Sequence, residues 1–236
     1  MRRWSRGLIR MSAFNRSKRC RIFPLILAAA AAWCQNRGST ISSDQALARL
    51  MEGNKRYASD NEQHPDETRA RRKELESGQH PFAVILSCAD SRVPPELIFD
   101  QGLGDLFVIR VAGNVAGEDD LASIEYAVEH LHIKLILVLG HEKCGAITAA
   151  VEGAHESGHL KDLLAEIQPS VHETRDVPGD KVHNCVLANA RRVAREIRES
   201  DPFLRDLIQK EQVTVVAADY ALDSGVVTVL DEAKYK

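Results

Sequence analysis

The segment Phe82-Ala83-Val84-Ile85-Leu86 decides the fold class, and Ser87-Cys88-Ala89-Asp90-Ser91-Arg92 follows it directly. Five consecutive apolar residues are typical of a strand that is buried on both faces, as in a parallel sheet covered by helices. The polar residues that follow then lie at the carboxyl end of this strand. Ligands bind at this end of open α/β sheets, so a functional site is expected directly after Leu86.

Further apolar runs repeat the strand pattern along the chain. They lie at Leu106–Arg110, Lys134–Leu139 and Val213–Ala218, and a short edge strand is expected at Val226–Leu230. Because stretches of helical periodicity separate these runs, the sequence predicts an α/β fold. We expect a mainly parallel central sheet of four strands plus the short edge strand, with helices on both faces.

The predicted helices alternate with the strands. They are Pro95–Phe99, Leu121–Leu131, Ala146–Val151, Asp162–Val171 and Val182–Arg198, preceded by a charged helix over Glu67–Ser77. The first helix of the domain begins near Ser43, and its N-cap is expected to be Ser43 or Asp44.

Length and composition indicate an ordinary globular protein. The chain has 236 residues, of which 44% are hydrophobic and 28% charged. This length gives room for one domain with a sizeable core, and the composition excludes a fibrous or largely disordered chain. Five cysteines are too few for a disulfide scaffold of this size.

Residues 1–32 are predicted to be a secretory signal peptide. They carry eight Lys or Arg and no acid, and an apolar stretch from Ile22 runs into the alanines Ala28–Ala32. This stretch is shorter than the roughly 20 residues that span a bilayer, so no stable membrane span is expected in the mature chain. The sequence predicts export, to the periplasm, with a cytoplasmic protein carrying an uncleaved basic tail as the alternative. Met11 is an alternative start to Met1.

The remaining chain is divided into a linker, 33–42, and a single domain, 43–236. After residues 1–32 are set aside, 23 basic side chains remain (31 in the chain less those eight) against 34 acidic ones, a formal net charge of −11. A protein with this net negative charge is not attracted electrostatically to nucleic acid, and no nucleic-acid partner is expected.

Two thiols and one imidazole form the candidate metal-ligand set. Cys88 follows the first strand, and His141 and Cys144 follow the third. This soft set selects zinc, and three protein ligands leave one coordination position open, as in catalytic zinc sites. The alternative, buried thiols near an incidental histidine, does not account for the acid and the arginine that follow Cys88.

Asp90 and Arg92 are predicted to form a catalytic dyad. An arginine can bond a carboxylate through two parallel N–H donors, which lowers the carboxyl pKa and keeps Asp90 ionised. Asp90 could then accept a hydrogen bond from a zinc-bound hydroxide. In the competing arrangement Asp90 is the fourth metal ligand and closes the site. A plain surface ion pair is the other alternative.

Four segments resemble the beta-class carbonic anhydrases. They are Ser87–Glu96, Leu106–Asn114, Gly140–Ala146 and Ala218–Gly225, and the resemblance covers about residues 43–230. It implies zinc-dependent, reversible hydration of carbon dioxide to bicarbonate and a proton. The implied zinc ligands are Cys88, His141 and Cys144, and the implied dyad is Asp90 with Arg92.

The resemblance also implies substrate contacts and an assembly. Gln101 could donate to bicarbonate through its amide, and Gly145 through its backbone N–H at a helix start. A homodimer or homotetramer is expected, because family members build their sites at a dimer interface. Arg110 and Tyr220 match two of the three residues with which some bacterial members bind inhibitory bicarbonate. Ile85 stands where the third, a tryptophan, would be, which argues against that control.

Two alternative functions keep the same metal site. One is an enzyme that hydrolyses carbonyl sulfide or carbon disulfide on this fold. The other is a zinc-binding protein without turnover, for scaffolding or metal storage. Storage needs no Asp90–Arg92 dyad, which favours an enzyme.

Overall fold

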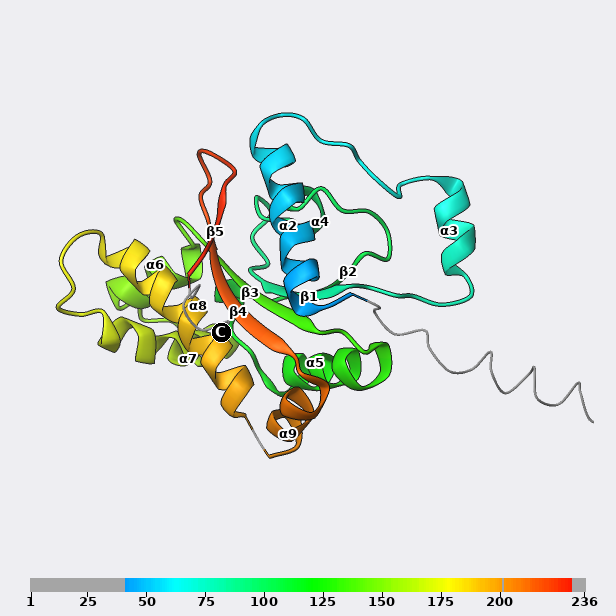
Figure 1. Ribbon diagram of the computed structural model, residues 1–236. Coiled ribbons are helices and arrows are strands. Elements are labelled where there is room, and N and C mark those ends of the chain that lie inside the picture. Colours follow the sequence, from blue (N-terminus) through cyan, green and yellow to red (C-terminus); the bar gives the residue numbers. More distant parts are fainter. Residues whose placement is uncertain (1–40, 201, 231–236) are drawn as a thin grey trace, which may run out of the picture. The chain divides into compact units, whose positions relative to one another are not determined.

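A five-stranded sheet lies at the centre of residues 41–200 and 202–230, the part of the chain that the computed structural model describes (Figure 1). Its strands are β1 (Ala83–Ser87), β2 (Leu106–Arg110), β3 (Leu135–His141), β4 (Thr214–Tyr220) and β5 (Val227–Val229). They are ordered β2-β1-β3-β4-β5, and only β5 runs antiparallel to its neighbour. The predicted fold class, four parallel strands plus a short edge strand, is confirmed.

Helices connect the strands and follow the predicted pattern closely. They are α2 (Ser43–Ala58), α3 (Arg69–Leu75), α4 (Pro95–Ile98), the 3-10 turn η1 (Ala112–Asn114), α5 (Glu118–Leu131), α6 (Gly145–Glu152), α7 (His159–Glu173), α8 (Lys181–Glu199) and α9 (Pro202–Glu211). Helix α9 was not predicted from the sequence, and β4 extends two residues beyond its predicted end.

The predicted N-cap of the first helix is wrong by one residue. Ser42 is the cap, and its hydroxyl accepts a hydrogen bond from the backbone N–H of Gln45. The Gln45 side chain accepts one in return from the Ser42 backbone N–H, which completes a capping box. This reciprocal pair explains why Ser42 is preferred to Ser43 or Asp44.

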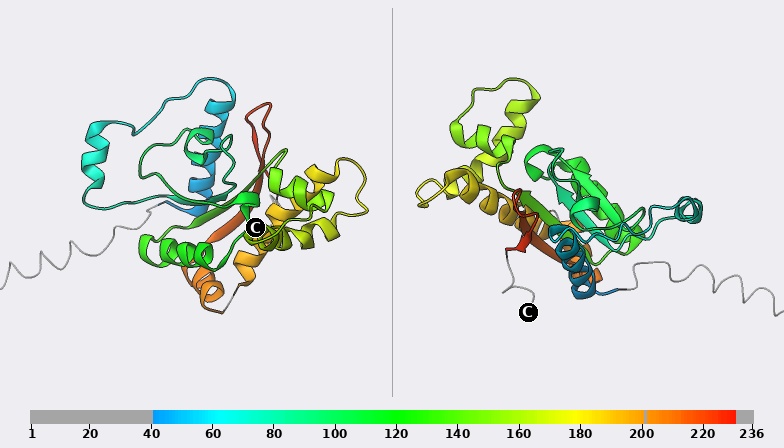
Figure 2. Two further views of the ribbon diagram at one scale, coloured as in Figure 1. Left: turned by 180° about the vertical axis from the view of Figure 1, so that it is seen from behind. Right: turned by 90° about the horizontal axis from the view of Figure 1, so that it is seen from above.

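Side chains of the strands alternate between two buried layers. In β3, Leu135, Leu137 and Leu139 pack in one layer, whereas Ile136 and Val138 pack in the other. Helices α2, α4, α6 and α7 contribute to the first layer, and α5 and α9 to the second, while α8 contributes to both. Helices α5 and α9 contact each other and lie side by side in the views of Figures 1 and 2. Burial on both faces explains why the strands are continuously apolar.

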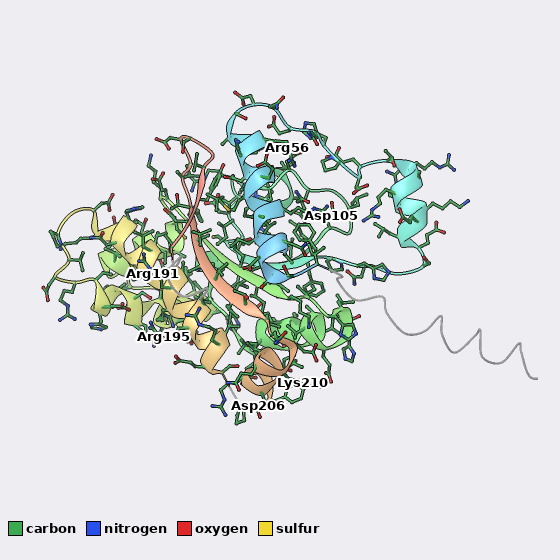
Figure 3. All side chains as sticks on the ribbon, viewed as in Figure 1. Arg56, Asp105, Arg191, Arg195, Asp206 and Lys210 are labelled. Carbon is green, nitrogen blue, oxygen red and sulfur yellow. The ribbon has the colours of Figure 1, made fainter. Side chains whose placement is uncertain are left out.

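Helix α2 is fixed to the segment between α4 and β2 by ion pairs. Arg56 contacts the carboxylate of Asp100 at 2.5 Å, and Arg49 contacts that of Asp105 at 3.0 Å. Arg56 and Asp105 are labelled in Figure 3. The two pairs lie at different points along the helix, so they set its orientation on the sheet as well as its position.

The described residues contain no helix that is both long and apolar enough to cross a membrane. The predicted signal peptide, 1–32, lies outside the described residues, and so does the predicted linker, 33–42, except for its last two residues.

Candidate metal centre

The candidate ligands lie at the point in the sheet where the chain reverses the direction in which it adds strands. From β1 the chain adds β2 on one side, and it later adds β3 on the other side of β1. The segments that leave the carboxyl ends of β1 and β3 therefore diverge, and in open α/β sheets such a switch point is where ligands bind. Cys88 directly follows β1, and His141 is the last residue of β3.

The structure brings the three predicted ligands together. One donor atom from each of Cys88, His141 and Cys144 lies within 4.8 Å of the other two, and the two sulfurs are 4.0 Å apart. The three residues are 4%, 1% and 1% exposed, respectively. Among the described residues, this is the one group of three or more such donors that could hold a metal ion.

His141 presents a nitrogen that the protein leaves without a partner. Its Nδ1 lies 2.9 Å from the carbonyl oxygen of Glu142 and therefore carries the proton. Its Nε2 is buried without a hydrogen-bond partner and is left with a free lone pair. A buried polar atom of this kind is costly unless a ligand satisfies it.

The donor set fits zinc. Tetrahedral zinc with zinc–sulfur bonds of about 2.3 Å places two sulfurs about 3.8 Å apart, close to the observed 4.0 Å. The Nδ1–H of His141 is held by a carbonyl, the arrangement that fixes the tautomer of metal-binding histidines.

The two sulfurs lie close enough to hydrogen-bond, and this contact shifts the pKa values of the two thiols in opposite directions. The hydrogen bond from Cys144 lowers the pKa of Cys88 despite its burial, and the backbone N–H groups of Asp90 and Gly113 lower it further. The backbone N–H groups of Asp90 and Gly113 each lie 3.4 Å from the Cys88 sulfur. The same thiol–thiolate bond, together with burial, raises the pKa of Cys144. The surroundings of Cys88 thus favour the thiolate, the form of cysteine that binds metal ions.

Asp90 is bonded to Arg92 through both carboxylate oxygens. Oδ1 accepts from the backbone N–H and Nε of Arg92, both at 2.9 Å, and Oδ2 accepts from Nη2 at 2.7 Å. These bonds hold the pKa of Asp90 well below its usual range. Arg92 also donates to the carbonyl of Lys143 at 3.2 Å, so it links the two ligand-bearing loops. The carboxylate is thus directed to Arg92 and is not in the metal-ligand group.

Comparisons with known proteins agree with this geometry. A family model described as "Carbonic anhydrase" matches residues 83–227. The chain is 39% identical over 180 residues to carbonic anhydrase 2 of Mycobacterium tuberculosis, covering 75% of this chain and 87% of that relative. The chain belongs to the carbonic anhydrase family.

Solved structures identify the class within this family. The beta-carbonic anhydrase CcaA superposes with a TM-score of 0.64 at 26% identity, covering 80% of this chain and 97% of its own. A tetrameric beta-carbonic anhydrase from the ascomycete Sordaria macrospora shares the fold, with a TM-score of 0.63 at 22% identity over 87% of this chain and 94% of its own. The chain is a member of the beta class, and the resemblance noted in the sequence is confirmed.

Arg110 supports the loop that carries the first ligand. It lies at the end of β2, in register with Ser87, and its Nε donates to the Cys88 carbonyl at 2.9 Å. Its Nη2 donates to the backbone carbonyl of Asp90. From the sequence, Arg110 was a candidate only for bicarbonate binding, because these backbone contacts depend on strand register. Tyr220, considered with it, lies with its hydroxyl 3.3 Å from that of Tyr57.

The two predicted substrate contacts lie in different places. Gly145 is the first residue of α6, directly after Cys144, and the space beside its Cα is open. Gln101 is buried, with its amide donating to the Phe99 carbonyl and accepting from Arg49. Both ends of this amide are thus occupied within the chain, and a bicarbonate contact at either residue stays a prediction.

Zinc stoichiometry tests the centre. We expect the purified protein to bind one zinc ion per chain and Cys144→Ser to lose stoichiometric zinc, as measured by elemental analysis after dialysis. Cys185→Ser is the matched control, because Cys185 is equally buried but lies in α8, where burial raises its thiol pKa to about 11. Equal zinc content in wild type and Cys144→Ser would contradict the assignment.

Proposed function

We propose that this chain catalyses the reversible hydration of carbon dioxide to bicarbonate and a proton at zinc held by Cys88, His141 and Cys144. The observation that carries the proposal is the buried three-donor cluster beside an ionised Asp90, in a chain of the carbonic anhydrase family. When bound, zinc supplies Lewis-acid activation of water as the nucleophile.

Asp90 is suited to orient that water. A carboxylate has about four acceptor positions, and three hydrogen bonds from Arg92 occupy three of them. One position is left to accept a hydrogen from water and so direct an oxygen lone pair at the substrate carbon. Because Asp90 is held ionised, it accepts and does not donate in this role.

Arg92 holds both Asp90 and the loop between β3 and α6, which carries Cys144. Its guanidinium holds both carboxylate oxygens, which keeps Asp90 from moving onto the metal as a closing ligand. Its bond to the Lys143 carbonyl lies one residue before Cys144, so the dyad and the ligand loops are fixed together. The arrangement favours the open site.

Asp90→Asn tests the proposed mechanism. The amide keeps the size of the side chain but loses the charge that Arg92 binds, so we expect kcat/KM for carbon dioxide hydration to fall by about 10- to 100-fold with zinc retained. Stopped-flow measurement with a pH indicator gives the rate, and Asp119→Asn, on the exposed first turn of α5, is the control.

Unchanged hydration in Asp90→Asn would contradict the role of the dyad. Wild-type protein that binds zinc but does not hydrate carbon dioxide would contradict the proposed reaction. Parallel assays with carbonyl sulfide and carbon disulfide would then identify a hydrolase on the same site, and inactivity with all three would indicate a zinc-binding protein without turnover.

We also propose that the chain is exported to the periplasm after removal of residues 1–32. The support is the sequence pattern of eight basic residues followed by an apolar and alanine-rich stretch. N-terminal sequencing of the exported protein is expected to give a start near Trp33. Cytoplasmic protein that retains the basic segment would contradict export.

Assembly as a homodimer or homotetramer is the last part of the proposal. Strand β2 lies at one edge of the sheet, and the large apolar side chains Leu97, Leu103 and Tyr126 are exposed near it. We expect light scattering to give the mass of two or four chains and Leu103→Asp to reduce it. Val177→Asp, at an exposed apolar residue in another segment, is the control. A monomeric wild type would contradict assembly.

A further inference from the structure

A fully buried amide lies behind the metal centre, between α7, α8 and η1. Asn189 is 0% exposed, and its Oδ1 accepts from the Ser170 hydroxyl at 3.2 Å and from Nη2 of Arg192 at 3.1 Å. Two donors on Oδ1 fix the orientation of the amide, so its Nδ2 is the donor that meets the Gly113 carbonyl at 2.8 Å. Asn189 therefore links α8 to a residue 76 positions earlier in the chain.

Arg192 holds this amide in place. Its guanidinium also donates to the Ser170 hydroxyl at 2.9 Å and to the Glu166 carbonyl at 2.6 Å, and it pairs with the Glu196 carboxylate. It is buried, whereas Arg195, one of the α8 residues labelled in Figure 3, is exposed. A buried guanidinium with its N–H groups engaged on both α7 and α8 cannot turn away, so Asn189 has one available arrangement.

Gly113 connects this network to the first ligand. Its carbonyl accepts from Asn189, and its N–H lies 3.4 Å from the Cys88 sulfur. It has a positive φ of 72°, and a Cβ at this position would lie 2.9 Å from Cδ1 of Ile167. Glycine is needed here, but glycine is also the residue with the greatest backbone freedom. The bond from Asn189 to the Gly113 carbonyl restricts this freedom on the side opposite the N–H that contacts the sulfur.

We propose that Asn189 is a positioning residue that keeps the Gly113 N–H on the Cys88 sulfur and thereby sets the donor strength of that thiolate toward the metal. This inference rests on the proposed function, in which Cys88 is a metal ligand. A hydrogen bond to a thiolate withdraws charge from sulfur and stabilises the anion. Asn189 touches neither the metal position nor the reacting atoms, so it acts only through Gly113.

The test uses cobalt(II) added to the metal-free full chain, because thiolate-to-cobalt charge-transfer absorption reports directly on sulfur. Asn189→Asp keeps the acceptor for Ser170 and Arg192 but removes the donor to Gly113. Asn189→Leu keeps the shape of the side chain without any hydrogen bond. We expect both variants to move the charge-transfer band to lower energy, because the sulfur loses a hydrogen bond that withdraws charge from it. We also expect cobalt binding, measured by chelator competition, to weaken by about 10- to 100-fold, because the thiolate is less stabilised and less firmly positioned.

Asn54 provides the matched control. It is also a buried amide, 3% exposed, and its Nδ2 donates to the carbonyls of Ile98 and Gly225 while its Oδ1 accepts from the N–H of Val227. Asn54→Asp and Asn54→Leu are expected to lower thermal stability as the Asn189 variants do, with the cobalt band and affinity unchanged. This separates positioning of the thiolate from general loss of packing.

The outcomes distinguish the inference from the proposed function. A wild-type band that the Asn189 variants leave in place, or a shift of equal size in the Asn54 variants, would overturn the positioning role and leave the metal centre standing. Absence of a thiolate band in wild type, or its persistence at full strength in the double variant Cys88→Ser, Cys144→Ser, would overturn the metal centre and the positioning role with it.

Discussion

Parallel pairing of β1 with β3, in register from Val84 and Ile136 to Ser87 and Leu139, places the end of each strand beside the other. Cys88 and His141 leave the sheet from these adjacent ends. Each ligand is then fixed by backbone that already belongs to the hydrogen-bonded ladder or directly follows it. The two buried layers on either side of the sheet cover this pairing and exclude water from the candidate ligands. The positions of these ligands are therefore fixed by the packing of the core.

The candidate site has a buried part, which offers ligands to a metal ion, and a more exposed part, which carries the charged pair Asp90–Arg92. The thiols and the imidazole are almost fully buried, where a bound soft metal would replace the solvation that they have lost. Asp90 and Arg92 are more exposed, and their mutual bonds keep the carboxylate charged and outside the group of candidate metal ligands. A catalytic zinc site needs both conditions, since the metal must be held tightly while one coordination position stays open.

Much of this arrangement is predictable from the sequence because it depends on local patterns. The buried strands are continuous apolar runs, and the ligands follow the first and third of them, so the fold class and the grouping of Cys88, His141 and Cys144 could be deduced. The capping box at Ser42 was missed because two neighbouring residues are also good caps. Helix α9 was not predicted, although its apolar residues, Leu204, Leu207 and Ile208, have helical spacing that could have identified it.

The supporting contacts could not be deduced, because they join residues that only the tertiary fold brings together. Arg110 reaches the carbonyls of the Cys88–Asp90 loop by virtue of the register between β1 and β2. Asn189 reaches Gly113 across the junction of α8 with η1. In the sequence each is an ordinary polar residue in a strand or a helix, without a pattern that marks its partner.

The strand order also has a kinetic consequence. About fifty residues, including β2 and α5, separate Cys88 from His141, yet the two must lie on neighbouring strands. Closing such a loop is an entropic cost that local structure does not repay, so the β1–β3 pairing belongs to the slow, non-local part of folding. A chain that has formed all its helices but not this pairing carries scattered thiols and no chelate. Tight capture of a metal ion by this protein would thus report that the central pair of strands has joined.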